Sequence, residues 1–203
     1  MHILIVFALP VYMASLARSA PLPEESTLVA NLEVVQRSRS LIQKILLFIP
    51  EVYESCIHIE TLKLNSSENA KLGRMATKIG ILSAPVLKSL SENFTLETGL
   101  KHMLQGLQLH RAMLSSVSVS PHLENKDKVM QLLDDIRDLA IQINKMLKAV
   151  VLPSPTPVAL RLLGKYDVQV AAHLTLEQLQ SFGQDMVRLL RTLDPSSDEE
   201  MES

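Results

Sequence analysis

This 203-residue chain contains little cysteine and no tryptophan, and its net charge is close to zero. It has one cysteine, no tryptophan, 3% aromatic residues and a formal net charge of -2 at pH 7. A single cysteine excludes an intrachain disulfide framework, so Cys56 is expected to be an unpaired thiol. A charge near zero gives no electrostatic basis for binding nucleic acid or an anionic membrane. Stability must therefore come from packed aliphatic side chains, in a chain that is 47% hydrophobic.

Motifs for catalysis and metal binding are also lacking. The sequence contains no HExxH, CxxC or GxSxG pattern and no phosphate-binding glycine loop. His102 and His110 lie about two helical turns apart, whereas two metal ligands on one helix need to be about one turn apart. We therefore expect that the protein is not an enzyme and that it has no cofactor and no metal site. His110 falls on an apolar stripe and is expected to be a hydrogen-bonded histidine in the core or at its rim.

The N-terminus has the pattern of a secretory signal. An apolar run from Ile3 to Leu9 is followed by Pro10 and by a small-x-small triplet that ends at Ala17. The run is far shorter than the roughly 20 residues that a membrane-spanning helix needs. We expect residues 1–17 to be a signal peptide cleaved after Ala17, with cleavage after Ala20 as the alternative. The product would be secreted and extracellular, without membrane insertion.

The rest of the chain is expected to be one helical domain, residues 18–193, followed by an acidic disordered tail, residues 194–203. Four segments repeat apolar residues at steps of three and four, as amphipathic helices do. They cover residues 28–49, 96–117, 129–150 and 176–193. Ser26 is expected to cap the first helix and Pro50 to end it. The third helix should be about 27 residues, or about 40 Å, long.

Connection lengths then predict a topology. About six residues join the second and third segments, so these helices should be antiparallel neighbours. The first connection, from Pro50 to about Phe94, and the last, from Val151 to Tyr166, are long enough to return along a helix. The expected fold is an all-α long-chain four-helix bundle, up-up-down-down, with two long crossover loops.

The start of the fourth helix has three readings. Asp167 would cap it after a full crossover, and a capping-box pattern at Thr175 offers a later start. A start near Val158 would leave too short a crossover and give an up-down-up-down bundle. These alternatives stay open at the level of sequence.

Two sequons gain meaning because the chain is expected to be secreted. Asn65-Ser66-Ser67 lies in the first long connection, and Asn93-Phe94-Thr95 precedes the second helix. We expect Asn65 and Asn93 to be glycosylation sites.

Two rows of polar residues lie off the apolar stripes. Glu33 shares a face of the first helix with Arg37, Ser40 and Lys44. On the third helix, an outward row is expected to consist of Asp135, Asp138, Gln142 and Lys145. By themselves such rows are typical of solvated faces.

Several segments, in order, match a known family. Residues 179–182 (LQSF) and 188–193 (RLLRTL) are similar to its LQSF…RVLRHL ending, and residues 106–114 (GLQLHRAML) to its GLFLYQGLL. IGI at 79–81 and AP at 84–85 match its LGIPWAP segment, and LEVV at 32–35 lies in a similar first helix. On these segments the chain resembles the granulocyte colony-stimulating factor family of long-chain cytokines.

The resemblance implies a receptor-binding role. Members bind a class I cytokine receptor ectodomain through two surfaces and assemble two ligands with two receptors. The main surface would use Glu33, Asp135 and Asp138, with Val29 as an apolar neighbour, and the second would use Glu60. The basic residue that members can carry three positions before the glutamate is replaced here by Ala30.

The cysteines depart from the family pattern. Mammalian members have two disulfides in the first crossover; Cys56 matches one of their cysteines, and Pro50 stands at its partner's position. We expect packing by Ile57, Ile59, Leu62 and Leu64 to compensate. The expected function is a secreted cytokine that promotes proliferation and differentiation of granulocytic and myeloid cells. The alternatives are another long-chain helical cytokine, interleukin-six-like or leptin-like, and a secreted lipid-binding helical protein.

Overall fold

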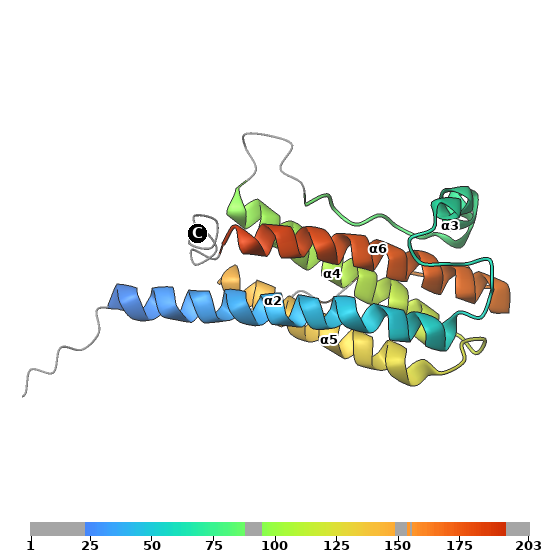
Figure 1. Cartoon of the computed structure of the whole chain (residues 1–203), viewed down its shortest axis with the longest axis horizontal. Helices are drawn as coiled ribbons and strands as arrows, with labels where there is room; N and C mark the ends of the chain where they lie inside the picture. Colours follow the sequence, from blue (N-terminus) through green and yellow to red (C-terminus); the bar gives the residue numbers. More distant parts are fainter. Residues whose placement is uncertain (1–22, 88–94, 149–153, 155, 194–203) are drawn as a thin grey trace, which may run out of the picture. The chain divides into compact units, whose positions relative to one another are not determined.

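The computed structural model describes residues 23–87, 95–148, 154 and 156–193. Over these ranges the chain is helical and has no strand, which confirms the all-α expectation. In chain order the elements are α2 (Pro23–Cys56), the 3-10 helix η1 (Ser67–Leu72), α3 (Gly73–Ile79), α4 (Leu96–Ser118), α5 (Lys126–Met146) and α6 (Lys165–Arg191) (Figure 1). The expected signal peptide, the acidic tail and Asn93 lie outside the described residues.

The chain divides into two compact units, Met1–Glu33 and Val34–Ser203. The described part of the first unit is the beginning of α2, in which the described side chains are those of Leu32 and Glu33. Val29 therefore lies in the helix, but its side chain is outside the description. The second unit contains the rest of α2 and all the other described elements.

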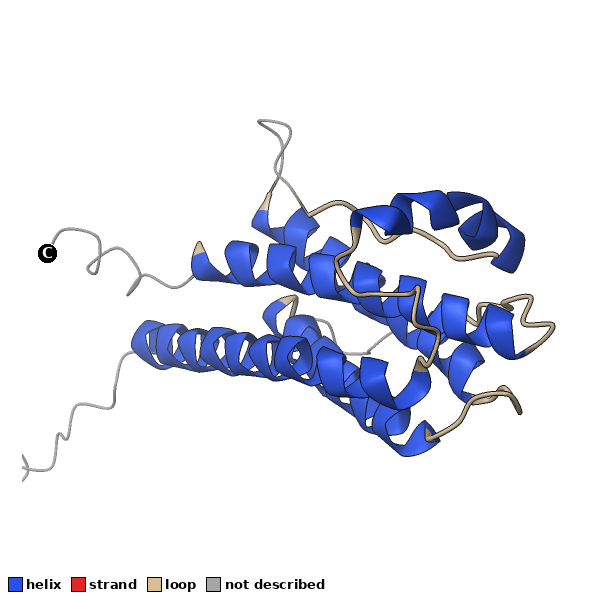
Figure 2. Ribbon diagram, turned by 45° about the vertical axis from the view of Figure 1, so that its right-hand side comes forward, coloured by secondary structure: helices blue, strands red, loops and turns tan. Residues whose placement is uncertain are grey.

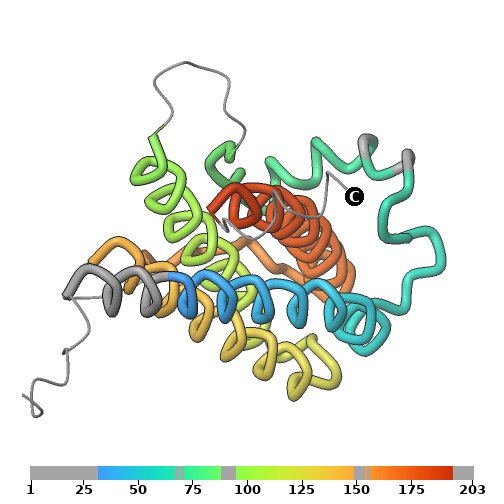
Figure 3. The backbone as a smooth tube through the Cα atoms, turned by 60° about the vertical axis from the view of Figure 1, so that its left-hand side comes forward, coloured from blue at the N-terminus to red at the C-terminus, as the bar shows by residue number. Residues whose placement is uncertain are grey.

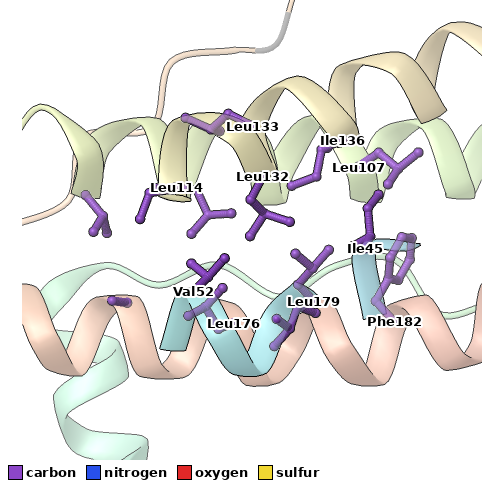
Figure 4. Packing of buried hydrophobic residues seen from close by; sticks show 14 of the residues in the cluster. Ile45, Val52, Leu107, Leu114, Leu132, Leu133, Ile136, Leu176, Leu179 and Phe182 are labelled. Carbon is purple, nitrogen blue, oxygen red and sulfur yellow. The ribbon is translucent and has the colours of Figure 1, made fainter. Parts of the chain in front are cut away.

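Aliphatic side chains from α2, α4, α5 and α6 form the core of the second unit. Ile45 of α2, Leu107 of α4, Ile136 of α5 and Leu179 of α6 are all fully buried and lie in one cluster between the helices (Figure 4). Each helix turns one apolar face inward, as the sequence periodicity predicts. Burial of aliphatic surface thus takes the place of a disulfide framework.

Pro50 lies inside α2 and does not end it, so that expectation was wrong. Proline has no N–H, and one helical hydrogen bond is lost there. The helix continues because the next turns bury Val52, Tyr53 and Cys56 in the core. The gain from their burial exceeds the cost of one missing bond.

The beginning of α2 also differs from the expectation. The helix starts at Pro23, so Ser26 lies within it and is not its N-cap. Proline suits the first turn because its ring fixes a helical φ and its missing N–H has no helical partner there anyway.

The short connection between α4 and α5, residues 119–125, makes these helices packed antiparallel neighbours, as expected (Figure 1). Thr95 caps α4 by accepting a hydrogen bond from the Thr98 N–H at 3.2 Å. α5 is 21 residues long, shorter than expected, with Leu147 as its C-cap. Lys148 has a φ of 52°, a left-handed conformation in which a helix cannot continue.

α6 begins at Lys165, which decides between the three expected starts. Gly164 is the N-cap, and the Asp167 carboxylate accepts a hydrogen bond from the Leu163 N–H at 3.2 Å. Asp167 is therefore not the N-cap that was expected; it lies in the first turn of the helix, and its side chain binds the residue before the cap. Thr175 is fully buried within the helix, and Val158 precedes it, so both alternative starts were wrong.

The described part of the first long connection, residues 57–87, is held against the bundle by apolar side chains. Ile57 and Leu62 are each 7% exposed, and Ile59 and Leu64 pack on the same core, in line with the expected compensating packing. The connection contains η1 and α3, and α3 lies against α6 (Figure 2).

Candidate functional site

The expected acidic row on α5 is only partly exposed. Asp138 and Lys145 face solvent, whereas Asp135 and Gln142 are each 7% exposed. The prediction that all four point outward was wrong: α2 runs beside α5 (Figure 3), and Asp135 faces it, where it meets Lys44. Asp134, which the sequence places next to this row, is exposed.

Asp135 is instead paired across the helix interface. Its Oδ1 accepts a hydrogen bond from Lys44 Nζ of α2 at 2.6 Å, and its Oδ2 is buried without a hydrogen-bond partner. The side chain of Lys44 is 54% exposed and that of Asp135 10% exposed. The pair therefore presents the lysine to solvent and keeps the carboxylate beneath it.

A groove of about 440 Å³ lies between α2 and α5 next to this pair. We call it the α2–α5 groove, and its lining residues are Ser40, Gln43, Lys44, Leu47, Phe48, Glu51 and Gln131. Leu47 is 79% exposed, although it is a large apolar side chain in the middle of a helix. Met130 of α5 is 51% exposed as well. Apolar side chains thus lie in the open among polar and charged groups.

Charged side chains lie on α2 and α5 near the groove. Arg137 forms ion pairs with Asp134 at 3.0 Å and with Asp138 at 3.3 Å. Lys128 lies 3.5 Å from Glu51 of α2. All five side chains are substantially exposed, so these contacts leave the charges available to a partner.

The exposure of Leu47 and the role of Lys44 were not predicted from the sequence. Leu47 lies off the apolar stripe that runs through Leu46 and Ile49, and an apolar residue out of register was the available signal. Lys44 was expected to lie in a solvated row, and no spacing rule connects it to a residue ninety-one positions away.

Glu33 is exposed on α2, as expected. It belongs to the first compact unit, whereas Asp135 and Asp138 belong to the second.

Glu60 is exposed in the first connection, just after the end of α2. Close to it in sequence, His58 lies 3.5 Å from Glu124, which also pairs with Lys165 at 2.6 Å. The hydrogen bond from Lys165 and its charge lower the pKa of Glu124. Glu124 thereby joins the α4–α5 connection to both the start of α6 and the residues around Glu60.

Asn65 is exposed and has a φ of 59°, a left-handed turn conformation that asparagine tolerates. The side chain of this sequon is therefore accessible. The other sequon asparagine, Asn93, lies outside the described residues.

Cys56 is an unpaired, buried thiol that donates to the Val52 carbonyl at 3.0 Å. Burial raises its pKa to about 12, so the thiolate needed for nucleophilic chemistry is suppressed. His110 is fully buried, with its Nδ1 hydrogen-bonded to the Gly106 carbonyl at 2.7 Å, as expected for a core histidine. Burial lowers the pKa of His110 to about 4.

Across the described ranges, no three His, Cys, Asp or Glu side chains gather in a way that could hold a metal ion. Nor does any helix there combine the length and hydropathy needed to cross a bilayer.

No protein-family model matches this chain, and a search of curated proteins found no significant relative. The α2–α5 groove, with its open leucine and flanking ion pairs, is the best-supported candidate site, and its geometry suits protein recognition.

Proposed function

We propose that this protein is a secreted long-chain four-helix cytokine of the granulocyte colony-stimulating factor type. It would bind a class I cytokine receptor ectodomain and promote proliferation and differentiation of granulocytic and myeloid cells. The proposed topology is up-up-down-down. The short connection at residues 119–125 and the long ones at residues 57–95 and 147–164 support it.

The observation that carries this proposal is the exposure of Leu47 in the α2–α5 groove. Leaving a leucine 79% exposed gives up much of the roughly 1.5–3 kcal/mol that burying it contributes. A partner that covers this side chain would regain that free energy on binding. Exposed apolar patches rimmed by polar groups mark protein interaction sites, and here Leu47 lines a groove together with Phe48 and polar side chains.

The charges around the groove suit recognition of a basic receptor surface. Asp134 and Asp138 offer carboxylates on α5, and Glu51 offers one on α2. Such charges favour rapid encounter and correct orientation, while affinity comes from a few well-packed anchors. Leu47 would be the anchor, and the carboxylates would select the partner. Asp135 would act indirectly, by holding Lys44 in place.

By the resemblance, Glu33 and Val29 would also take part in binding the receptor, and Glu60 would belong to the second surface. Two surfaces on one ligand would allow two ligands to assemble with two receptors. Glycans at Asn65 and Asn93 would suit an extracellular ligand.

Surface binding of the mature chain to a granulocyte colony-stimulating factor receptor ectodomain tests the proposal. The variants are Leu47→Glu, Asp138→Lys and Glu33→Lys. The matched control is Leu82→Glu, since Leu82 is also an exposed leucine, at 48%, but does not line the groove. We expect Leu47→Glu to weaken binding by about 2 kcal/mol or more, as for a hot-spot residue. Leu82→Glu should bind like the wild type.

Each outcome has a distinct meaning. Equal loss in Leu47→Glu and Leu82→Glu would contradict the groove as the site. Failure of the folded wild type to bind would overturn the receptor assignment. Binding to an interleukin-six-type or leptin-type receptor would then identify a sibling cytokine. Increased helix content on liposomes, without receptor binding, would identify a lipid-binding protein instead.

A further inference from the structure

A buried hydrogen-bond network joins α2, the first connection and α6 away from the α2–α5 groove. His173 of α6 is fully buried and lies at its centre. The Tyr53 hydroxyl of α2 lies 2.8 Å from His173 Nδ1, and Asn69 Oδ1 of η1 lies 3.0 Å from His173 Nε2. Each ring nitrogen thus has a partner on a different element.

The contacts of Asn69 fix the protonation of the ring. Asn69 Nδ2 donates to the Lys63 carbonyl at 3.1 Å and to Glu177 Oε1 at 2.6 Å. Its Oδ1 is therefore the acceptor that faces His173, so Nε2 carries the proton and donates it. Nδ1 then accepts from the Tyr53 hydroxyl. The neutral ring satisfies all of these bonds together.

A second proton on His173 would disturb this arrangement. Nδ1 of His173 would become a donor, but in the neutral state it accepts a hydrogen bond from the Tyr53 hydroxyl, so two donors would face each other. The imidazolium would also attract Glu177, whose Oε2 already lies 3.8 Å from Nε2. A direct charged contact between His173 and Glu177 would compete for the carboxylate and the ring nitrogen that hold Asn69.

We propose that His173 is a pH-sensitive latch: a second proton shifts the ring from Asn69 to Glu177 and releases η1 and the first connection from α6. The latch needs no assumption about the receptor. It would loosen the segment that carries Glu60 when the protein enters an acidic compartment.

The surroundings of His173 keep it neutral above mildly acidic pH. Burial lowers its pKa, and Glu177 opposes this only in part. Burial also raises the pKa of Tyr53 to about 12, so the tyrosine stays protonated, with the Cys56 thiol as its other titratable neighbour on α2. α3 also packs on α6, and its Arg74 and Lys78 are exposed.

Linkage gives the size of the effect. When the latch is open, His173 takes a proton near its usual pKa of about 6.5, whereas the closed latch resists it. Between about pH 7.4 and about pH 5.5 the opening equilibrium can therefore rise about tenfold. The closed form keeps its full stability above about pH 6.5, the usual pKa of a histidine such as His173 in the open form. It becomes less stable as the pH falls below that value.

Hydrogen–deuterium exchange of the full mature chain at these two pH values tests the latch, after correction for intrinsic exchange rates. We expect amides of residues 57–72 to be less protected than core amides of α4 and α5 at both pH values, and to lose protection by up to about tenfold at the lower pH. His173→Gln cannot titrate and should abolish this change. His122→Gln, at an exposed position, should keep it.

Asn69→Ala provides a second test if His173→Gln does not fold. It removes the contact that protonation breaks and should raise exchange of residues 57–72 already at the higher pH. Unchanged pH dependence in His173→Gln, or no effect of Asn69→Ala, would overturn the proposal. Equal protection of residues 57–72 and of the α4 and α5 core amides would also overturn it, since all of them would then exchange through global unfolding.

Discussion

Lys44 Nζ of α2 lies 2.6 Å from Asp135 Oδ1 of α5, and this contact joins two helices whose residues are ninety-one positions apart. The carboxylate is nearly covered, and the ammonium group is half exposed. The aspartate therefore fixes the helix pair and the position of a cation at the α2–α5 groove. It does not offer its own charge to a partner.

A double-mutant cycle on this pair should show measurable coupling. We expect Lys44→Met and Asp135→Asn to be coupled by about 0.5–1 kcal/mol, reduced by the exposure of Lys44 to solvent. Urea unfolding of the wild type, the two single variants and the double variant measures it. The control is the same cycle on Lys128 and Glu51, whose atoms lie 3.5 Å apart and are both exposed. Equal coupling in the two cycles would show that burial of Asp135 adds nothing.

Stability should decrease in mild acid because of His110. Its Nδ1 is bonded to Gly106, and its Nε2 is buried without a hydrogen-bond partner, so a second proton would have no acceptor. The folded pKa of about 4 is below the unfolded value of about 6.5. The contribution of neutral His110 to the free energy of unfolding is thus complete above about pH 6.5 and is lost as the pH falls toward 4. The total loss is up to about 3 kcal/mol.

Guanidinium unfolding at several pH values checks this prediction. His110→Leu should flatten most of the dependence and leave the part due to His173, whose pKa is lowered too. His122→Gln should behave like the wild type, because His122 is exposed. An unchanged slope in His110→Leu would contradict the assignment.

Gly106 of α4 makes room for the ring of Phe182. A Cβ at Gly106 would lie 2.1 Å from Phe182 Cζ, and Phe182 is only 6% exposed. Gly106→Ala should therefore lower the free energy of unfolding by about 1–3 kcal/mol, despite the better helix propensity of alanine. Thermal unfolding measures this loss.

Two further variants make the Gly106 result specific. Gly73→Ala adds a Cβ with no heavy atom within 4 Å and should not destabilise the protein. Adding Phe182→Leu to Gly106→Ala should recover part of the loss, because the smaller side chain can move aside. Independent, additive effects of the two changes would mean that they do not share a contact.

Cys56 should be unreactive in the folded protein. It is 2% exposed, and burial raises its pKa to about 12. Iodoacetamide at about pH 8 should label it only after denaturant is added, because thiolate is the reactive form. Ser181→Cys, at an exposed position on α6, provides a second thiol that should be labelled in the native state. Native-state labelling of Cys56 at the denatured rate would contradict the buried assignment.

The sequence by itself determined that the protein is helical and where most of its core lies. Ile42, Ile49, Leu132 and Ile136 repeat at helical spacing, and all are fully buried. The short connection after α4 similarly predicted an antiparallel pair. These features are local, because periodicity and loop length act between residues that are close along the chain.

Tertiary structure alone decided how wide each buried face is and which helix covers it. Asp135 is buried because α2 lies beside it, while Leu47 of α2 is left open. Pro50 stays in α2 because the residues after it have a core to enter, and His173 gains its hydrogen-bond partners from two other elements, α2 and η1. Each depends on contacts between residues far apart in the chain, and helical periodicity gives the direction of a side chain but not what lies opposite it.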